Sequence, residues 1–372
     1  MSLRTAAAGV VLAAALALLG GCGSSGEDGD AELRIYVSAP LSGPRADDGR
    51  DIVDGARLAL ADAGGESGGV AVSMRALDDA DAGGWDGAQT GANAREAAQD
   101  STAIAYLGEL DSGASRTSIP ITNEAEILQI SPGSGAEDLT REELGTSGVP
   151  AVQASGERTF GRVIPSDRAQ GTAAGAWMAE EGAATVRVFG GGEPFGRALL
   201  AGIEAAPGAP EPAPEGAAEA SFVVFSDAAR RPPADVPVYG SDDLLVPALR
   251  QPGPPGREPI RVVSAALAPS QLPAAAREFL DGFSERYGRE PGRYAAYGYE
   301  SMALALDSID RAGDPLDRGS VTEAFFDTSD RESVLGTYSI DSVGDTTLGA
   351  LGAYRIGADL RPRPEPDPLE LP

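Results

Sequence analysis

The sequence predicts an α/β protein with parallel sheets, and the clearest evidence lies in residues 104–135. Residues 104–107 and 127–130 are short apolar runs, as expected of strands buried on both faces of a parallel sheet. A small-residue turn and a helical segment with an apolar face separate the two runs, which gives a strand–helix–strand unit. A chain of 372 residues is long enough for two lobes, each with its own core.

The turn that follows the first of these strands predicts a binding site. Open parallel sheets bind their ligands beyond the carboxyl ends of the strands. Ser112, Gly113 and Ser115 fall at the start of the next helix, where hydroxyls and unpaired backbone N–H groups are available to a carboxylate or another small anion. Residues 132–135 break the chain again at the same edge of the sheet.

The first 22 residues have the features of a secretory leader. Arg4 gives a short positive start, and residues 6–19 form an apolar run that is shorter than the roughly 20 residues of a spanning helix. Leu19-Gly20-Gly21-Cys22 resembles a bacterial lipobox, in which Cys22 is lipidated and becomes the mature N-terminus. An ordinary signal peptide with a chance cysteine is the alternative. Residues 23–31 are rich in Gly, Ser and acidic residues and predict a flexible tether.

The remaining chain alternates between strand and helix patterns, as an α/β fold requires. Strands are predicted at residues 33–37, 70–74, 104–107, 127–130, 160–164, 185–189, 222–225, 236–239 and 260–267. Helices are predicted at residues 51–61, 93–98, 167–181, 274–287, 294–312 and 321–326. Residues 335–356 predict a β-hairpin with its turn at 343–345, and residues 361–372 an extended Pro-rich tail.

Composition excludes several classes of function. The net charge of −28 disfavours a nucleic-acid partner, and its simplest meaning is a well-solvated surface. The chain contains no histidine and no lysine, which removes the Ser-His-Asp triad, imidazole metal ligands and Schiff-base chemistry. A single cysteine cannot form an internal disulfide. The cluster Asp78, Asp79 and Asp81 has a metal site as one interpretation, but an acidic loop fits better because the spacing of an EF-hand is absent. We therefore predict no enzyme activity, no cofactor and no metal.

Several stretches share a resemblance to one family. Within residues 104–135, the segments SGAS and SIPITNEAEILQISP carry the resemblance. Residues 39–60, 158–177, 283–302 and 330–341 carry it elsewhere in the chain. Together, and in this order, they resemble the branched-chain amino-acid-binding proteins of ABC importers, which are type I periplasmic binding proteins. The resemblance implies a two-lobe fold in which each lobe is a mostly parallel sheet flanked by helices and a three-strand hinge joins the lobes. It assigns residues 32–157 and 269–334 to lobe 1, and residues 158–268 and 335–360 to lobe 2.

One region departs from the family pattern. Between residues 203 and 222 the family has a strand, a loop and a helix, whereas this chain has a short Pro-rich segment. Residues 226–235 likewise replace an expected helix. We therefore expect lobe 2 to be abridged.

The resemblance also implies a ligand site between the lobes. In the family, the ligand carboxylate meets the SGAS-type turn and the following SP turn, and its ammonium group meets an acidic residue of lobe 2. Ser134 stands next to Gly135, which replaces a family threonine, and Phe195 keeps the ring of a family tyrosine without its hydroxyl. The ligand-binding residues implied in this chain are Ser112, Gly113, Ser115, Gly133, Ser134, Phe195 and Asp242.

The sequence thus predicts a lipid-anchored extracytoplasmic solute-binding protein of an ABC importer. It would act as a monomer, close its hinge on a small amino acid or related solute and present the closed state to the permease, touching the membrane through its N-terminal lipid alone. The alternative is a ligand sensor, or a degenerate homologue that engages a protein partner, and the abridged lobe 2 favours that alternative. A hydrolase is a third and weaker hypothesis.

Overall fold

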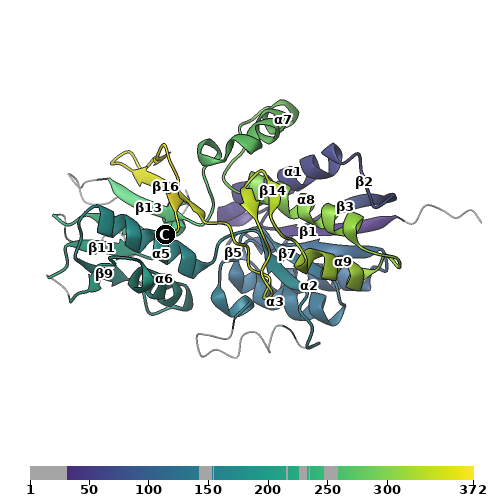
Figure 1. The fold of residues 1–372 in the computed structure, drawn as a ribbon, viewed down its shortest axis with the longest axis horizontal. Coiled ribbons are helices and arrows are strands. Elements are labelled where there is room, and N and C mark those ends of the chain that lie inside the picture. The colour runs from purple at the N-terminus through teal and green to yellow at the C-terminus, as the bar shows by residue number, and fades with distance from the viewer. Residues whose placement is uncertain are drawn as a thin grey trace, which may run out of the picture. The chain divides into compact units, whose positions relative to one another are not determined.

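Two sheets, each made mostly of parallel strands, organise the chain (Figure 1). The computed structural model describes residues 32–141, 153, 155–214, 217–225, 233, 235–246 and 259–372. The predicted leader, Cys22 and the tether lie outside these residues. Within the described part of the chain, no helix combines the length and the apolar character needed to cross a bilayer.

The first sheet has the strand order β2-β3-β1-β6-β7-β8, and every neighbouring pair is parallel except β2 with β3. The strands are β1 (Leu33–Ala39), β2 (Glu66–Ser67), β3 (Val70–Asp78), β6 (Ala103–Leu107), β7 (Leu128–Ser131) and β8 (Phe160–Arg162). All residues of β6 and β7 are buried, which explains the uninterrupted apolar character of β6, whereas β7 also buries Gln129 and Ser131. We call this sheet and the helices packed on it lobe 1.

Helices cover both faces of the first sheet. Ile35 and Val37 share a core with α1 (Ala46–Asp62), α7 (Arg277–Tyr287) and α8 (Ala295–Arg311). Tyr36 and Tyr106 point to the other face, where α2 (Gly87–Gln99) and α3 (Ser112–Glu124) pack. The shorter elements of lobe 1 are α9 (Arg318–Phe326) and the two small hairpins β4–β5 (Ala80–Asp81, Gly84–Trp85) and β14–β15 (Arg331–Ser333, Gly336–Tyr338).

The second sheet forms lobe 2 and has the order β10-β9-β11-β12-β13-β16-β17, with β18 also paired to β16. Its strands are β9 (Thr185–Phe189), β10 (Glu211–Pro212), β11 (Ala220–Val223), β12 (Val238–Gly240), β13 (Ile260–Ser264), β16 (Ala350–Ile356), β17 (Pro362–Pro364) and β18 (Leu369–Glu370). The strands from β10 to β13 are parallel, whereas β16 is antiparallel to β13, β17 and β18. The described α-helices of lobe 2 are α5 (Asp167–Glu180) and α6 (Pro194–Ala205).

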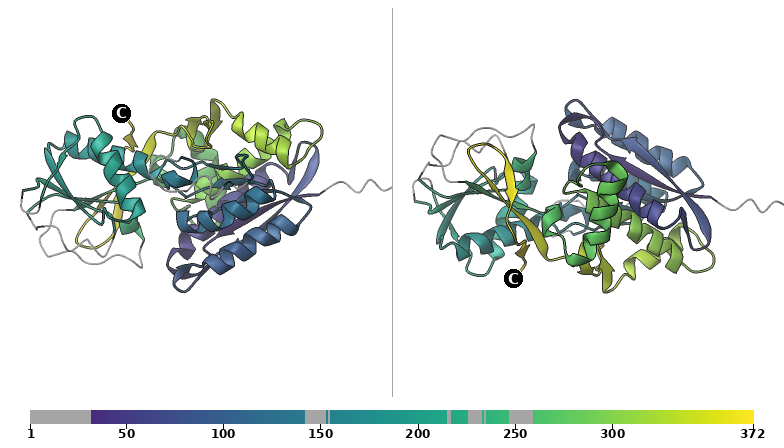
Figure 2. Two further views of the ribbon diagram at one scale, coloured as in Figure 1. Left: turned by 90° about the horizontal axis from the view of Figure 1, so that it is seen from below. Right: turned by 90° about the horizontal axis from the view of Figure 1, so that it is seen from above.

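The two faces of the second sheet are covered unequally. Phe222 and Val263 pack under α5 and α6 in a core that includes Trp177 and Leu199. On the opposite face, a smaller cluster is completed by two leucines of the 3-10 turn η4 (Asp242–Leu245). Figure 2 shows α5 and α6 beside this sheet in both views. Among the described residues, the second face thus has no α-helix in its core.

The predicted α/β class and the two-lobe arrangement are confirmed. Three local expectations differ from the structure. The segment expected to open lobe 2 forms β8 and extends the lobe 1 sheet beyond β7, so the passage to lobe 2 follows it. The tail after residue 360 is no free extension, because β17 and β18 use the open edge of β16. The hairpin expected over residues 335–356 is reduced to a bridge between Ile340 and Thr346 around the predicted turn.

The Pro-rich departure between residues 203 and 222 retains a trace of the expected strand. Glu211 and Pro212 form β10, which pairs in parallel with Thr185 and Val186 of β9. Both residues of β10 are exposed, and a proline has no N–H to donate to a sheet. The segment therefore ends the sheet at this edge.

Candidate functional site

A cavity of about 720 Å³ lies where the turns at the carboxyl ends of both sheets meet. From lobe 1 it is lined by the turn before α3, the turn after β7 and the β4–β5 hairpin. From lobe 2 it is lined by the first turns of α5 and α6 and by η4. Its size falls within the usual range for small-molecule sites, and parallel sheets bind their ligands at this edge.

The N-terminus of α3 is open toward a ligand. Asp111 occupies the N-cap position but makes no capping hydrogen bond, because its carboxylate accepts from Arg45 at 2.8 Å. Ser112 and Gly113 line the cavity, and their N–H groups belong to the first turn of the helix, which has no intrahelical acceptor. The Ser112 hydroxyl accepts from the N–H of Ala136 at 3.1 Å and ties this turn to the turn after β7. The arrangement suits a carboxylate.

The hydroxyls of Ser115 and Ser134, predicted as ligand contacts, serve the scaffold instead. Both side chains are fully buried and share a hydrogen bond of 2.8 Å beneath the turn. Ser134 and Ser131 also donate to the carbonyl of Glu109, at 3.0 and 2.7 Å. Because these bonds use the hydroxyls and neither residue lines the cavity, the geometry corrects the prediction: the two serines hold the turns together.

A buried acidic pair lies behind the same turn. Asp79 and Glu109 are both fully buried, and Glu109 accepts from the Tyr106 hydroxyl at 2.7 Å. Burial and the neighbouring Glu109 raise the pKa of Asp79 to about 10, and burial also raises the pKa of Glu109. The pair therefore retains a proton at neutral pH. In the described chain, no group of three or more acidic, His or Cys side chains is arranged to hold a metal ion.

Lobe 2 brings four carboxylates to the cavity, those of Glu193 and Asp243 and those of Asp242 and Asp167. Asp242, at the start of η4, accepts from the side-chain amide of Gln170 at 3.3 Å, and that amide also donates to the Val263 carbonyl at 2.7 Å. Asp167 is the first residue of α5, after the N-cap Ser166. Neither Asp167 nor Asp242 has an ion-pair partner within 4 Å among the described residues. Both acceptors are therefore available to a positively charged ligand group.

Asp167 lies against the turn after β7. Its N–H donates to the Gly135 carbonyl at 2.8 Å, and a Cβ placed on Gly135 would stand only 2.1 Å from Asp167 Oδ1. Glycine at position 135 thus leaves the room that the carboxylate occupies. Burial raises the pKa of Asp167 to about 8, with the negative charges of Asp242 and Glu137 adding to the rise and Arg162 and Arg116 opposing it.

The arginines of lobe 1 at the cavity are already paired. Arg45 contacts Asp48 at 3.2 Å and Asp111 at 2.8 Å. Arg116 forms a two-pronged pair with Asp138, at 2.8 and 2.6 Å. Asp167 and Asp242 therefore offer acceptors to a ligand's ammonium group, while Arg197 of lobe 2 also lines the cavity and donates to the Gly192 carbonyl.

Aromatic rings from both lobes complete the cavity wall. Trp85 comes from the β4–β5 hairpin and Tyr294 from the residue before α8. Phe195 and Phe225 come from lobe 2, and their ring centroids are 6.0 Å apart. Tyr297, the other aromatic residue near the start of α8, does not line the cavity, and its hydroxyl accepts from the Leu267 N–H at 3.0 Å.

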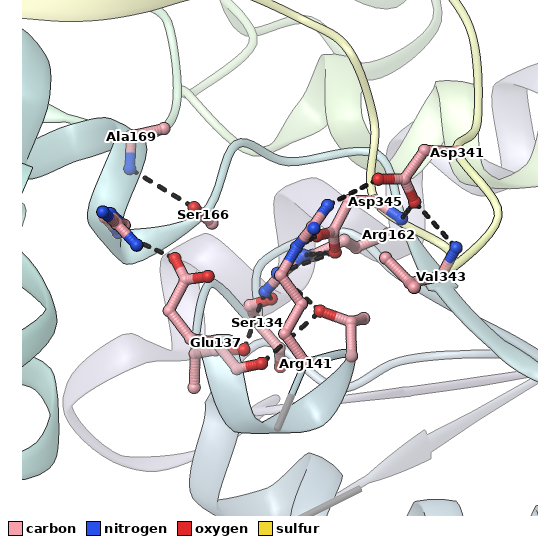
Figure 3. A network of polar contacts seen from close by, with 12 residues as sticks. Ser134, Glu137, Arg141, Arg162, Ser166, Ala169, Asp341, Val343 and Asp345 are labelled. Carbon is pink, nitrogen blue, oxygen red and sulfur yellow. Dashed lines mark hydrogen bonds and ion pairs between the residues drawn. The ribbon is translucent and has the colours of Figure 1, made fainter. Parts of the chain in front are cut away.

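A buried ionic network lies where the chain passes from lobe 1 to lobe 2 (Figure 3). Arg162 at the end of β8 is fully buried, pairs with Asp345 at 2.7 Å and donates to the Ser134 and Ala136 carbonyls at 3.2 and 2.9 Å. Arg141 pairs with Asp341 and Asp345 at 2.5 and 2.8 Å. Against the effect of burial, Arg162 and Arg141 hold the pKa of Asp345 below its ordinary value. The network thereby ties the end of β8 and the segment that carries Asp341 and Asp345 to the turn after β7.

Five of the seven predicted site residues line the cavity: Ser112, Gly113, Gly133, Phe195 and Asp242. Sequence reasoning missed Asp167, Trp85 and the Arg45–Asp111 pair. Asp167 was assigned only to the start of a helix, and its proximity to Gly135 depends on the crossing of the chain after β8. One sequence feature could have pointed to Trp85. It follows Gly83 and Gly84 in a polar stretch, where a tryptophan is not expected to be part of the core.

Comparison with solved structures finds the same fold in solute-binding proteins. A leucine-binding protein, LivK from Thermotoga maritima, is similar with a TM-score of 0.69 and 19% identity, over 90% of this chain and 97% of that chain. An ABC transporter substrate-binding protein from Desulfitobacterium hafniense, in complex with Leu, has a TM-score of 0.72 and 20% identity, over 90% and 100%. A solute-binding protein of an ABC transporter from Rhodopseudomonas palustris, in complex with 3,4-dihydroxybenzoic acid, has a TM-score of 0.67 and 18% identity, over 88% and 93%.

The family model described as periplasmic binding protein matches residues 32–210. This match and the shared fold confirm that the chain resembles periplasmic binding proteins, as inferred from the sequence. The similar solved proteins are named as leucine-binding and substrate- or solute-binding proteins, two of them of ABC transporters. A search among curated proteins gave no match.

Proposed function

We propose that the protein is the solute-binding component of an ABC importer, and that it binds a zwitterionic amino acid or a closely related solute between its lobes. One observation carries the proposal. The same cavity presents an uncapped helix N-terminus at Ser112 and Gly113 and two carboxylates without a cationic partner, Asp167 and Asp242. These groups complement the two charges of an amino acid.

Ligand binding would hold the two lobes together. The carboxylate of the ligand would accept from the first turn of α3 in lobe 1, and its ammonium group would donate to Asp242 and Asp167 in lobe 2. Because each charge engages a different lobe, the ligand favours the closed arrangement over an open one. The permease would then recognise the closed protein, which is tethered to the membrane through a lipid on Cys22 and acts as a monomer.

The ligands of the similar proteins do not decide between an amino acid and a simple carboxylic acid. The similar proteins include one in complex with Leu and one in complex with an aromatic acid, 3,4-dihydroxybenzoic acid. Asp167 and Asp242, which have no ion-pair partner within 4 Å among the described residues, favour a ligand with an ammonium group over a simple acid in this chain.

A second candidate function is a sensor that presents its ligand state to a protein partner. It is favoured by the thin second core of lobe 2, which η4 completes among the described residues. A sensor and a transport protein would bind the ligand in the same way, so the distinction rests on whether the bound protein stimulates an ATP-hydrolysing permease or a different partner.

The proposal is tested by titration calorimetry of the purified protein with a panel of neutral, acidic and basic amino acids. We expect at least one to bind, with Asp242→Asn and Ser112→Ala each weakening it at least tenfold, since a hydrogen bond to a charged group contributes about 1.5–3 kcal/mol. Arg363→Ala, which removes an exposed pair with Asp359, is the matched control and should leave binding unchanged. A well-folded protein that binds no member of the panel would contradict the proposal.

Lipid anchoring is tested separately. Labelling of cells with a radioactive or clickable fatty acid should mark the protein, and Cys22→Ser should abolish the label and release the protein from the membrane fraction. Retention of the label in the Cys22→Ser variant would contradict this part of the proposal.

A further inference from the structure

We infer that the ligand carries an aromatic ring, held between Trp85 of lobe 1 and the Phe195–Phe225 pair of lobe 2. The inference rests on the proposed function, because it assigns the side chain of the zwitterion that the charged groups would hold. It is drawn from the placement of the rings that line the cavity.

Trp85 is the large apolar side chain that the described structure leaves most open. It is 43% exposed, and among the described residues it is the exposed large hydrophobic side chain. Exposed tryptophan is unfavourable for a soluble surface unless another molecule covers it. Trp85 stands at a cavity wall, so the molecule that covers it would be the ligand.

The indole of Trp85 is also fixed in place beside the proposed carboxylate site. A Cβ placed on Gly113 would stand 2.4 Å from Cζ2 and 2.9 Å from Cε2 of the indole. The ring thus packs directly on the backbone of the first turn of α3, and any side chain at position 113 would displace it. A ligand whose carboxylate meets this turn has its α-carbon next to the indole.

Lobe 2 supplies the facing aromatic surface. Phe195, in the first turn of α6, and Phe225, just after β11, are both partly buried, and their rings meet at an interplanar angle of 55°. Tilted and edge-to-face contacts of this kind are favourable, and a third ring can add to them. Both side chains line the same cavity as Trp85.

The rest of the cavity contains little aliphatic surface. Leu110 and Val246 are the branched aliphatic side chains of its wall, whereas four aromatic residues line it. The cavity of about 720 Å³ also leaves space beyond the charged groups for a side chain larger than that of alanine or valine. Aromatic walls on both lobes therefore favour a flat ring over a branched aliphatic chain.

The test compares phenylalanine with 3-cyclohexylalanine, which has the same backbone and a ring of similar size without aromatic character. We expect phenylalanine to bind roughly two- to tenfold more tightly, the range expected for one or two aromatic contacts beyond simple burial. In Trp85→Leu the preference should fall to about one, and Trp85→Phe should retain most of it. Trp177→Phe, which alters a buried tryptophan of lobe 2, is the control and should keep the wild-type preference.

A spectroscopic readout supports the calorimetry. In the Trp177→Phe variant, Trp85 is the remaining tryptophan of the chain, so its fluorescence reports on the cavity alone. Saturating phenylalanine should at least halve the quenching of this fluorescence by acrylamide.

The outcomes separate the inference from the proposed function. If amino acids bind, but 3-cyclohexylalanine or leucine binds as tightly as phenylalanine and Trp85→Leu changes nothing, the aromatic assignment is overturned and the proposed function stands. If no amino acid binds and Trp85 stays open to acrylamide with every probe, both are overturned. A preference for phenylalanine that disappears in Trp85→Leu supports both.

Discussion

The two lobes share one sheet architecture but differ in how completely they are built and in what they bring to the cavity. Lobe 1 has helices on both faces of its sheet, and its arginines at the cavity, Arg45 and Arg116, are paired with acidic neighbours. Lobe 2 has α-helices in the core of one face among the described residues, and Asp167 and Asp242 at the cavity have no ion-pair partner within 4 Å among those residues. Lobe 1 therefore offers the ligand mainly backbone N–H donors, and lobe 2 offers the carboxylates of Asp167 and Asp242.

This difference indicates which lobe determines ligand specificity. A helix N-terminus fixed by buried serines and an acidic pair, as in lobe 1, recognises any carboxylate and offers few ways to vary. The short loops of lobe 2 carry Asp167, Phe195 and Asp242, which decide what else the ligand must contain.

The largest effect is expected where the lobes are joined. Arg162→Met removes a fully buried cation and leaves Asp345 without its closest partner. We expect the free energy of unfolding to fall by about 3–5 kcal/mol, because the buried Asp345 carboxylate would keep only Arg141 and the Ser134 and Ala136 carbonyls would lose their donor. Urea denaturation followed by circular dichroism measures the change.

Arg141→Met is the matched control for this substitution. Arg141 contacts the same Asp345 carboxylate, but its side chain is 36% exposed. We expect a loss below about 1 kcal/mol, as for other solvent-accessible pairs. Equal losses for the two variants would contradict the role of Arg162 as the buried centre of the network.

A second prediction compares the cores of the two lobes directly. Leu107 in β6 and Leu244 in η4 are both buried, at 1% and 3% exposure. Leu107→Ala should cost about 3–5 kcal/mol, whereas Leu244→Ala should cost about 2 kcal/mol, because a thinner layer can collapse into the space left behind. Hydrogen exchange should also show faster opening in β12 than in β6. A larger cost at Leu244 would show that lobe 2 is the better-packed lobe.

A third prediction concerns the pH dependence of ligand binding. Because the pKa of Asp167 is raised to about 8, its carboxyl group is largely protonated at pH 6, and an ammonium ligand must displace that proton. Affinity for an amino acid should therefore rise with pH between 6 and 8, by up to about tenfold per unit, and level off above 8. In Asp167→Asn the affinity should be lower and independent of pH in this range. An unchanged pH dependence in Asp167→Asn would contradict a direct contact.

The same raised pKa has a consequence for the unliganded protein. The folded state binds more protons at Asp167 than the unfolded state between about pH 4 and pH 8, so this group makes the protein less stable as the pH rises through that range. Asp167→Asn should flatten that part of the stability profile, which is measured by urea denaturation at several pH values.

The sequence predicted the fold better than the site for identifiable reasons. Apolar runs such as residues 104–107 are buried on both faces whatever surrounds them, so their pattern alone identified β6 and β7. Ser112 and Gly113 were found because a helix start after a strand is a local feature. The hydroxyl directions of Ser115 and Ser134 could not be predicted because they depend on Glu109, whose N–H donates to Ser115 and whose carbonyl accepts from Ser134.

Other features depended on contacts between distant segments. Asp167 meets Gly135 because β8 adds to the first sheet before the chain crosses, and no local pattern encodes that pairing. Asp111 makes no capping hydrogen bond to α3 because its carboxylate accepts from Arg45, which is distant in the sequence. The pairing of the Pro-rich tail with β16 was also missed, since prolines usually avoid sheets and are tolerated here at an edge.

The central claim is that lobe 1 binds the carboxylate of the ligand and lobe 2 its ammonium group. The most direct measurement is a calorimetric comparison of phenylalanine with 3-phenylpropionate, which lacks the ammonium group, and with phenethylamine, which lacks the carboxylate. We predict that both analogues bind at least tenfold more weakly than phenylalanine, and that Asp242→Asn weakens phenylalanine and phenethylamine but leaves 3-phenylpropionate unaffected. Binding of 3-phenylpropionate as tight as that of phenylalanine would contradict the account.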